Sequence, residues 1–250
     1  MRNVTAAGFS FLVCLLISTP FAFAKDELAL KLLKSADKAR GNEKLGLTWT
    51  CRLSTTEDGE KSEREFLIKA QGDNSYVEAT QPSRTKGEVY IFNDRSMWFF
   101  KPSLKRPVSI SPRQKLSGQA ANGDIASTRY SRDYDATIEK AEVYDGEKTH
   151  VLMLKAKSNN LTYDRIRYWI SDSKQLAVKA EFLTLQGQVF KTATIAYDNS
   201  IKIGSSVQPF VSRMTITDAR NGKNQSIMEY IKPRRESHPS SIFNVGNLSR

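Results

Sequence analysis

The chain has 250 residues, of which 39% are apolar and 26% are charged, and its formal net charge is +11. This composition is typical of a globular protein with one sizeable core and excludes a disordered or low-complexity chain. Two cysteines and two histidines, scattered along the sequence, are too few for a metal-ligand motif.

The first 24 residues are predicted to form a cleavable signal peptide. A positively charged start precedes an apolar run from Phe9 to Ile17, and the small-x-small sequence Ala-Phe-Ala occupies positions 22–24. The run is too short to span a bilayer, although an uncleaved anchor is the alternative. A lipid anchor is rejected because Cys14 follows Val13 within the run. We therefore expect an exported single domain over residues 25–250.

An amphipathic helix is predicted over Lys25–Arg40. Leu28, Leu32 and Leu33 recur at helical spacing, and Gly41 supplies a stop signal. Acidic residues are expected in its first turn and basic residues in its last, where they complement the helix dipole. The apolar stripe must be buried, and the concave face of a curved sheet is the expected place.

From residue 45 onward the pattern is that of short strands. The predicted strands are Leu47–Leu53, Glu63–Gln71, Tyr76–Thr80, Glu88–Phe92, Ser96–Lys101, Thr137–Tyr144, Thr149–Lys157, Tyr163–Ile170, Ala177–Leu185, Val189–Tyr197, Val207–Asp218 and Ser226–Ile231. Asp-Gly at 58–59 and 145–146 and Asn-Gly at 221–222 predict hairpin turns. The expected fold is mainly β: a large curved antiparallel sheet or incomplete β-barrel of about eleven strands with an N-terminal helix.

The segment Leu104–Ser131 interrupts this pattern with glycines, small residues and prolines. A connection this long is unusual in a compact domain. We expect a loop over one end of the barrel, with a short helix around Asp124–Tyr130, so that loop and helix form a lid over the concave face.

The sequence contains no recognisable catalytic motif. The nucleophile elbow, the zinc-protease helix and the phosphate-binding loop are all absent from it. No catalytic residue, cofactor or metal is therefore predicted. Cys51, the single cysteine after the signal peptide, is predicted to be a buried and inert strand residue.

Aromatic and apolar side chains are abundant in the predicted strands. Any one of them is more often a core residue than a ligand contact. However, a sheet of about a dozen strands encloses more space than eight strands, whose interior side chains can just fill. We therefore predict an apolar cavity lined by some of five residues, which are Trp98, Phe100, Phe182, Phe210 and Met214.

The order of several segments resembles the outer-membrane lipoprotein-sorting protein family, the LolA-like group of the LolA/LolB superfamily. The resemblance covers nearly the whole chain after the signal peptide, and its segments are Gln81-Pro82 with Lys86-Gly87, Met97–Pro107, Tyr134–Thr137, Arg167–Ile170 with Asp172, and Ser241–Val245 with Leu248 and Arg250. The chain departs from the family within 117–126, where bulky residues are replaced by alanines.

This resemblance implies an open barrel whose cavity takes acyl chains. The implied function is a periplasmic carrier of lipoprotein or lipid between the inner and outer membranes, working with an inner-membrane exporter of the resistance-nodulation type. The basic charge favours transient contact with anionic membrane surfaces rather than nucleic acid, which is scarce outside the cytoplasm. A monomer is expected. The alternatives are an envelope-stress sensor that binds lipidated ligands without transporting them and a secreted hydrolase, which the absence of a catalytic motif disfavours.

Overall fold

The computed structural model describes residues 20–248 apart from 43, 95 and 127–128. The helices are α1 (Pro20–Lys38) and α2 (Tyr130–Asp133), with 3-10 turns η1 (Asn122–Asp124), η2 (Ser240–Phe243) and η3 (Val245–Asn247). The strands are β1 (Leu47–Glu57), β2 (Glu60–Gln71), β3 (Asn74–Gln81), β4 (Val89–Asn93), β5 (Ser96–Phe100), β6 (Val108–Ile110), β7 (Lys115–Ser117), β8 (Ala120–Ala121), β9 (Tyr134–Tyr144), β10 (Glu147–Ala156), β11 (Arg165–Ser171), β12 (Ala177–Leu183), β13 (Val189–Ala196), β14 (Asn199–Ile203), β15 (Ser206–Phe210), β16 (Arg213–Asp218) and β17 (Gln225–Arg235). Most of the predicted signal peptide lies outside the described residues, so its cleavage stays a prediction.

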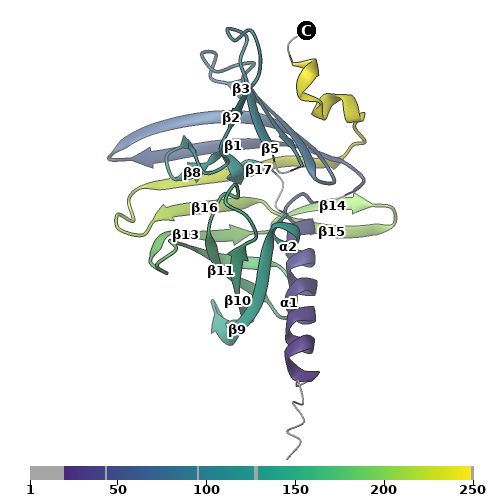
Figure 1. Ribbon diagram of the computed structural model, residues 1–250, viewed down its shortest axis with the longest axis vertical. Coiled ribbons are helices and arrows are strands. Elements are labelled where there is room, and N and C mark those ends of the chain that lie inside the picture. Colours follow the sequence, from purple (N-terminus) through teal and green to yellow (C-terminus); the bar gives the residue numbers. More distant parts are fainter. Residues whose placement is uncertain (1–19, 43, 95, 127–128, 249–250) are drawn as a thin grey trace, which may run out of the picture.

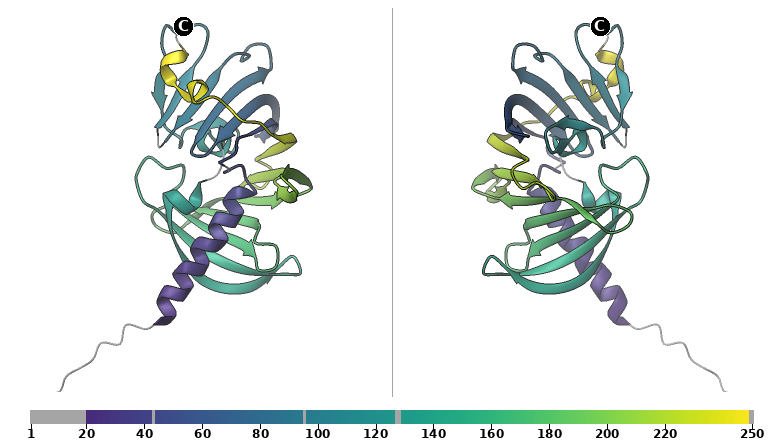
Figure 2. Two further views of the ribbon diagram at one scale, coloured as in Figure 1. Left: turned by 90° about the vertical axis from the view of Figure 1, so that its right-hand side faces the viewer. Right: turned by 90° about the vertical axis from the view of Figure 1, so that its left-hand side faces the viewer.

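Thirteen strands form one antiparallel sheet in the order β6-β5-β4-β3-β2-β1-β17-β16-β13-β12-β11-β10-β9. Two runs of neighbouring hairpins therefore meet at the β1–β17 pair. We call β1–β6 the first half, and β9–β13 with β16 and β17 the second half. Figures 1 and 2 show the sheet strongly bent, with the two halves facing each other across the interior. The predicted curved antiparallel sheet and incomplete barrel are confirmed, with thirteen strands in the sheet instead of about eleven.

The concave face of the sheet is apolar because the strands alternate. In β1, Leu47, Trp49, Cys51 and Leu53 are buried, and the residues between them are mostly half-buried. Directly opposed residues share a face, so the concave row continues from Trp49 through β2 to β5.

Two of the three predicted hairpin turns are tight turns. The Asp-Gly pairs at 58–59 and 145–146 both have positive φ at both residues, as a type I′ turn requires. The third pair, at 221–222, instead lies in a longer loop in which the Asp218 carboxylate accepts the N–H groups of Arg220 and Asn221.

The predicted strand Val207–Asp218 is two strands. β15 pairs with β14 in a separate hairpin, and β16 belongs to the large sheet. The strands separate because Val211 donates its N–H to the Ala39 carbonyl, at the end of the helical region, while Ser212 donates to Ala196.

Helix α1 covers the concave face of the second half, where it packs against β9 and β11 (Figure 2). Its buried stripe consists of Ala29, Leu32, Leu33 and Ala36. The helix begins at Pro20 rather than at Lys25, so its first turn carries no acidic residue, contrary to the expectation. Gly41 follows its end with φ of 99°, a conformation that favours glycine. No helix in the described part of the chain is both long and apolar enough to cross a bilayer.

The chain crosses the molecule between residues 104 and 133, because β6 and β9 lie at opposite edges of the sheet. This crossing segment begins with β6, the edge strand of the first half, and continues through β7, β8, η1 and α2. It is therefore less irregular than predicted, and its α-helix lies a few residues later than expected. Three of its small or apolar side chains, Ala120, Ile125 and Ala126, belong to the hydrophobic core.

Two glycines let the crossing segment approach other elements closely. A Cβ atom at Gly118 would lie 2.6 Å from Ser226 Oγ on β17 and 2.8 Å from Thr55 Cβ on β1. A Cβ atom at Gly123 would overlap the Thr162 side chain in the β10–β11 loop. The segment is therefore fitted against both halves of the sheet, which explains its small residues.

Residues 236–248 form a C-terminal strap over the other, convex face of the first half (Figures 1 and 2). His238 Nε2 lies 3.0 Å from Thr48 Oγ1 and 3.1 Å from the Leu47 carbonyl oxygen. Asn93 donates its side-chain N–H to the carbonyl of Phe243, and η2 packs against β3 and β4. The strap thus fixes the chain end against the sheet.

Candidate functional site

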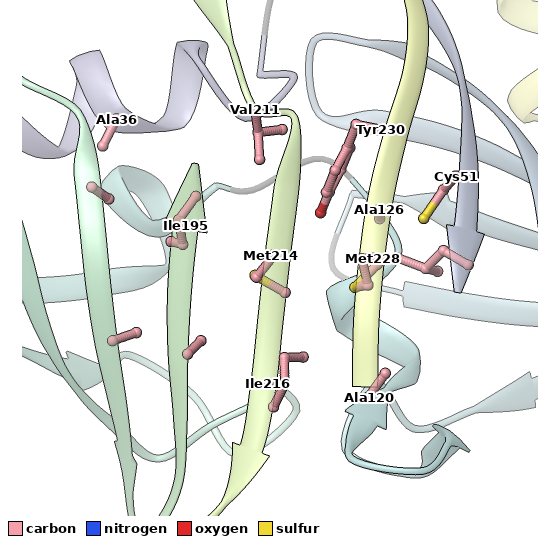
Figure 3. Close-up of a cluster of buried hydrophobic side chains, with 14 of the residues drawn as sticks. Ala36, Cys51, Ala120, Ala126, Ile195, Val211, Met214, Ile216, Met228 and Tyr230 are labelled. Carbon is pink, nitrogen blue, oxygen red and sulfur yellow. The ribbon is translucent and has the colours of Figure 1, made fainter. Parts of the chain in front are cut away.

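The interior is one continuous hydrophobic cluster that both halves of the sheet, α1 and the crossing segment share. Figure 3 shows the part where the halves meet, with Met214 on β16, Met228 and Tyr230 on β17, and Cys51 on β1. Ala120 of the crossing segment belongs to the same cluster.

A cleft of about 60 Å³ reaches this interior beneath α2. Its lining residues are Arg40, Phe92, Asp94, Met97, Pro112, Gly123, Asp124, Arg129, Tyr130, Arg132, Asp133, Tyr134, Asn160, Leu161 and Thr162. They come from the end of α1, the β4–β5 hairpin, the crossing segment, the start of β9 and the β10–β11 loop. Ligand pockets usually measure about 300–1,000 Å³. The cleft as it stands is therefore too small to hold a ligand of that size.

Arg40 is the most unusual residue of the cleft. The side chain is buried, and its guanidinium lies over the ring of Tyr130, with 5.7 Å between Cζ and the ring centre. One Nη donates to the Tyr168 hydroxyl at 3.2 Å and the other lies 3.2 Å from the Met214 sulfur. Among the described residues, Arg40 Nε has no hydrogen-bond partner. A permanent positive charge therefore lies inside an aromatic and apolar surrounding.

Two buried carboxylates lie near Arg40, and each accepts hydrogen bonds from other groups. Asp37 accepts the N–H groups of Tyr130 and Ser131 at 3.1 and 2.8 Å, which ties α1 to α2. Burial raises the pKa of Asp37 to about 6, although these hydrogen bonds and Arg40 oppose the shift. Asp124 accepts the Ala121 N–H and the Tyr163 hydroxyl, and burial raises its pKa too.

Arg132 within α2 and Arg129 at its start attach this helix to two hairpin turns of the first half. Arg132 pairs with Asp73 at 2.9 Å, with Asp94 at 3.2 Å and with Asp133 at 2.8 Å. Arg129 donates to the backbone carbonyls of Asp73 and Asp94. Because Asp37 holds α2 on the other side, the cleft is closed by a polar bracket, which we define as α2 with Arg129, Arg132 and their partners.

The predicted cavity residues fall into two groups. Phe182, Phe210 and Met214 are buried members of the core, but only Met214 comes close to the cleft, through Arg40. Trp98 and Phe100 oppose Ile91 and Val89 on the face of the sheet that points away from the core cluster. Their neighbours on β5, Met97 and Phe99, point to the core instead.

The three leucines predicted to pack beneath the sheet also differ. Leu32 and Leu33 are buried in the core, whereas Leu28 is 37% exposed. The next residue, Ala29, is fully buried, so Leu28 is exposed because its side chain lies on another side of the helix. Leu28 thus lies beside the buried stripe of α1 and not within it.

Arg40, Asp37 and Tyr130 were not predicted as site residues. The signal was present in the helix, since Asp37 follows Leu33 by four residues and Arg40 follows Ala36 by four. This spacing puts both charges on the apolar stripe. A charge at a helix end is normally solvated and complements the dipole, and that ordinary interpretation concealed their burial.

Two other reactive side chains, Cys51 and His150, do not line this cleft. Cys51 is fully buried in β1, as predicted, and burial raises the pKa of its thiol. His150 lies 2.7 Å from Asp172 near the surface. No three His, Cys, Asp or Glu side chains gather as a metal site within the described ranges.

Several solved structures share this fold. A LolA superfamily protein from Nitrosomonas europaea has a TM-score of 0.77 at 28% identity, over 88% of this chain and 98% of that chain. A putative outer membrane lipoprotein-sorting protein domain from Vibrio parahaemolyticus has a TM-score of 0.74 at 22% identity, over 90% and 100%. A DUF1329 family protein from Desulfovibrio piger has a TM-score of 0.74 at 17% identity, over 90% and 99%.

Sequence comparison adds a family assignment. A search of curated proteins gives no match. A family model whose description reads "-like: Uncharacterized protein" matches residues 71–250, which is more than half of the chain. The chain therefore belongs to the family that this model defines, and it is LolA-like, with the fold of the LolA superfamily.

Proposed function

We propose that this protein is a periplasmic carrier that takes acyl chains of a lipoprotein or lipid into its apolar interior and moves them between the inner and outer membranes. The mature protein would be a single domain from Lys25 onward, exported by the predicted signal peptide. An inner-membrane exporter would supply the cargo, and the basic surface would favour transient contact with anionic membranes.

The polar bracket is the observation that carries this proposal. It closes a cleft whose inner residues, including Met97 and Leu161, belong to the continuous core. Partly exposed ion pairs stabilise a contact by only about 1 kcal/mol, so they can be broken without unfolding the sheet. Apolar chains entering behind the bracket would gain roughly 0.8 kcal/mol for each buried methylene.

No chemistry is assigned to the cleft, because the buried carboxylates in and beside it are engaged in hydrogen bonds and ion pairs. Asp37 and Asp124 accept hydrogen bonds from backbone N–H groups and from Tyr163. Asp133 pairs with Arg132. This arrangement supports a carrier rather than a hydrolase.

The proposal is tested with a neutral apolar fluorophore, N-phenyl-1-naphthylamine. Wild-type protein should take it up saturably, and Arg132→Ala should speed uptake about fivefold if the bracket contributes about 1 kcal/mol. Arg213→Ala is the matched control, because Arg213 forms a similar 2.9 Å pair with Glu229 away from the cleft. Lipid extraction of protein purified from the periplasm should release acyl-containing material. Wild-type protein without saturable uptake or extractable lipid would refute the carrier function.

A further inference from the structure

Arg40 has far more hydrogen-bonding capacity than its surroundings use. A guanidinium presents five N–H donors, and those of Arg40 meet the Tyr168 hydroxyl, the Tyr230 side chain and the Met214 sulfur, which is a weak acceptor. Its Nε has no partner among the described residues, and the side chain is only 5% exposed. Burying a charge is costly unless the charge is paired, so the contacts of Arg40 do not fully compensate the desolvation of its guanidinium.

The neighbouring carboxylates compensate this charge only in part. Neither Asp37 nor Asp124 lies within ion-pair distance of Arg40 in the described structure, since their oxygens accept the N–H groups of Tyr130, Ser131 and Ala121. Their role is to hold the crossing segment. Arg40 lines the cleft, and its Nε is fully buried without a partner among the described residues, so an anionic oxygen would reach this donor only after the polar bracket moves.

The rest of the wall is suited to a hydrocarbon chain. Phe92, Met97 and Leu161 line the same cleft as Arg40 and continue into the core. The cleft thus has one cation at the end of an apolar wall. An amphiphile with one anionic end and one hydrocarbon chain complements this arrangement.

We infer that Arg40 binds the anionic end of the cargo, a carboxylate or phosphate oxygen joined to an acyl chain. This inference rests on the proposed carrier function and specifies its ligand class. Arg40 Nε and an Nη would donate to the anionic oxygens, while the chain occupies the apolar interior after the polar bracket moves. The planar guanidinium of arginine can donate two parallel hydrogen bonds to one anionic group, which the ammonium of lysine cannot do in a fixed geometry.

The test is competition against N-phenyl-1-naphthylamine by three ligands below their critical micelle concentrations: palmitate, methyl palmitate and 1-palmitoyl lysophosphatidate. Wild-type protein should bind at least one of the two anionic ligands at least tenfold more tightly than the neutral ester. The preference should persist at high salt, because a buried pair is weakly screened. Whichever anionic ligand is preferred identifies the carboxylate or the phosphate as the source.

Arg40→Met keeps an unbranched, flexible side chain that reaches about as far as Nε, and it removes the charged guanidinium. It should bind methyl palmitate within threefold of wild type and lose at least tenfold for the preferred anionic ligand. Lys38→Met is the matched control, because it removes the same charge from the exposed face of the same helix and should change neither affinity. Thermal unfolding verifies that each variant is folded.

The failures of the two proposals are distinguishable. Equal binding of acid and ester by wild-type protein overturns the role of Arg40 while leaving the carrier function intact, and it needs no variant. If Arg40→Met still prefers the anionic ligand, the proposed role of Arg40 is overturned as well. Absence of uptake of the fluorophore and of all three ligands overturns the carrier function itself.

Discussion

The two halves of the sheet are similar strand meanders, but they are covered in different ways. The concave face of the second half is covered by α1, a regular helix with four buried apolar residues. The crossing segment lies against both halves, and its core residues Ala120, Ile125 and Ala126 follow no helical period. Helix α1, the regular cover, stabilises its half of the sheet through the apolar surface area that it buries. The crossing segment, the irregular cover, depends instead on close packing and on polar contacts. The irregular cover is therefore the part suited to move.

The largest effect should come from the regular cover. Leu32→Asp puts an unpaired carboxylate where the leucine is 2% exposed, which should destabilise the fold by about 4 kcal/mol or more. Chemical denaturation measures the loss. Leu30→Asp, at a position that is 40% exposed on the same helix, should cost less than about 1 kcal/mol. Equal effects of the two variants would show that α1 does not cover the second half.

The contact between the two covers should respond to pH through Asp37. Its pKa is raised from 3.8 to about 6, so the folded state binds a proton that the unfolded state has lost in this range. Stability from this group is therefore present below pH 4 and lost as pH rises through 6, by about 3 kcal/mol. Asp37→Asn lacks this dependence, so wild type should lose about that much relative to the variant between pH 4 and 7. A constant difference would contradict the burial of an ionisable Asp37.

The irregular cover should be sensitive to a single methyl group. Gly123→Ala places a Cβ against Thr162 and should destabilise the protein by about 1–3 kcal/mol through overpacking. Thr162→Ala should restore part of this loss in the double variant, which a thermodynamic cycle measures. Gly222→Ala is the control, because no atom lies within 4 Å of its added Cβ. If Gly123→Ala is as stable as the control, the crossing segment is not closely fitted.

The smallest effect is expected on the convex side of the junction between the halves. Arg213 on β16 pairs with Glu229 on β17, which also lies 3.8 Å from Arg52 on β1. These side chains are largely solvated, so Arg213→Ala should change the free energy of unfolding by about 0.5 kcal/mol or less. A loss above about 1 kcal/mol would mean that ion pairs, rather than the backbone ladder and the core, join the two halves.

The regular parts of this fold could be predicted because they repeat. Alternation in β1 identifies Leu47, Trp49, Cys51 and Leu53 as one face, and the Asp-Gly turns identify two hairpins. The residues of the candidate site were harder to predict from the sequence. Alternation separates Trp98 from Met97 but does not say which of them faces the core, because both are large and apolar and the convex face is itself partly covered.

By itself, the sequence determined the local periods: an apolar helical stripe at Leu32 and Leu33, alternating strands, and turns at fixed places. These depend on interactions between near neighbours, which composition and spacing encode directly. Only the tertiary structure decided that β1 pairs with β17, that the crossing segment therefore passes between the two sheet edges, and that Arg40 lies inside the protein. Each of these depends on contacts between residues more than a hundred positions apart, such as Arg40 with Tyr168, for which no local pattern exists.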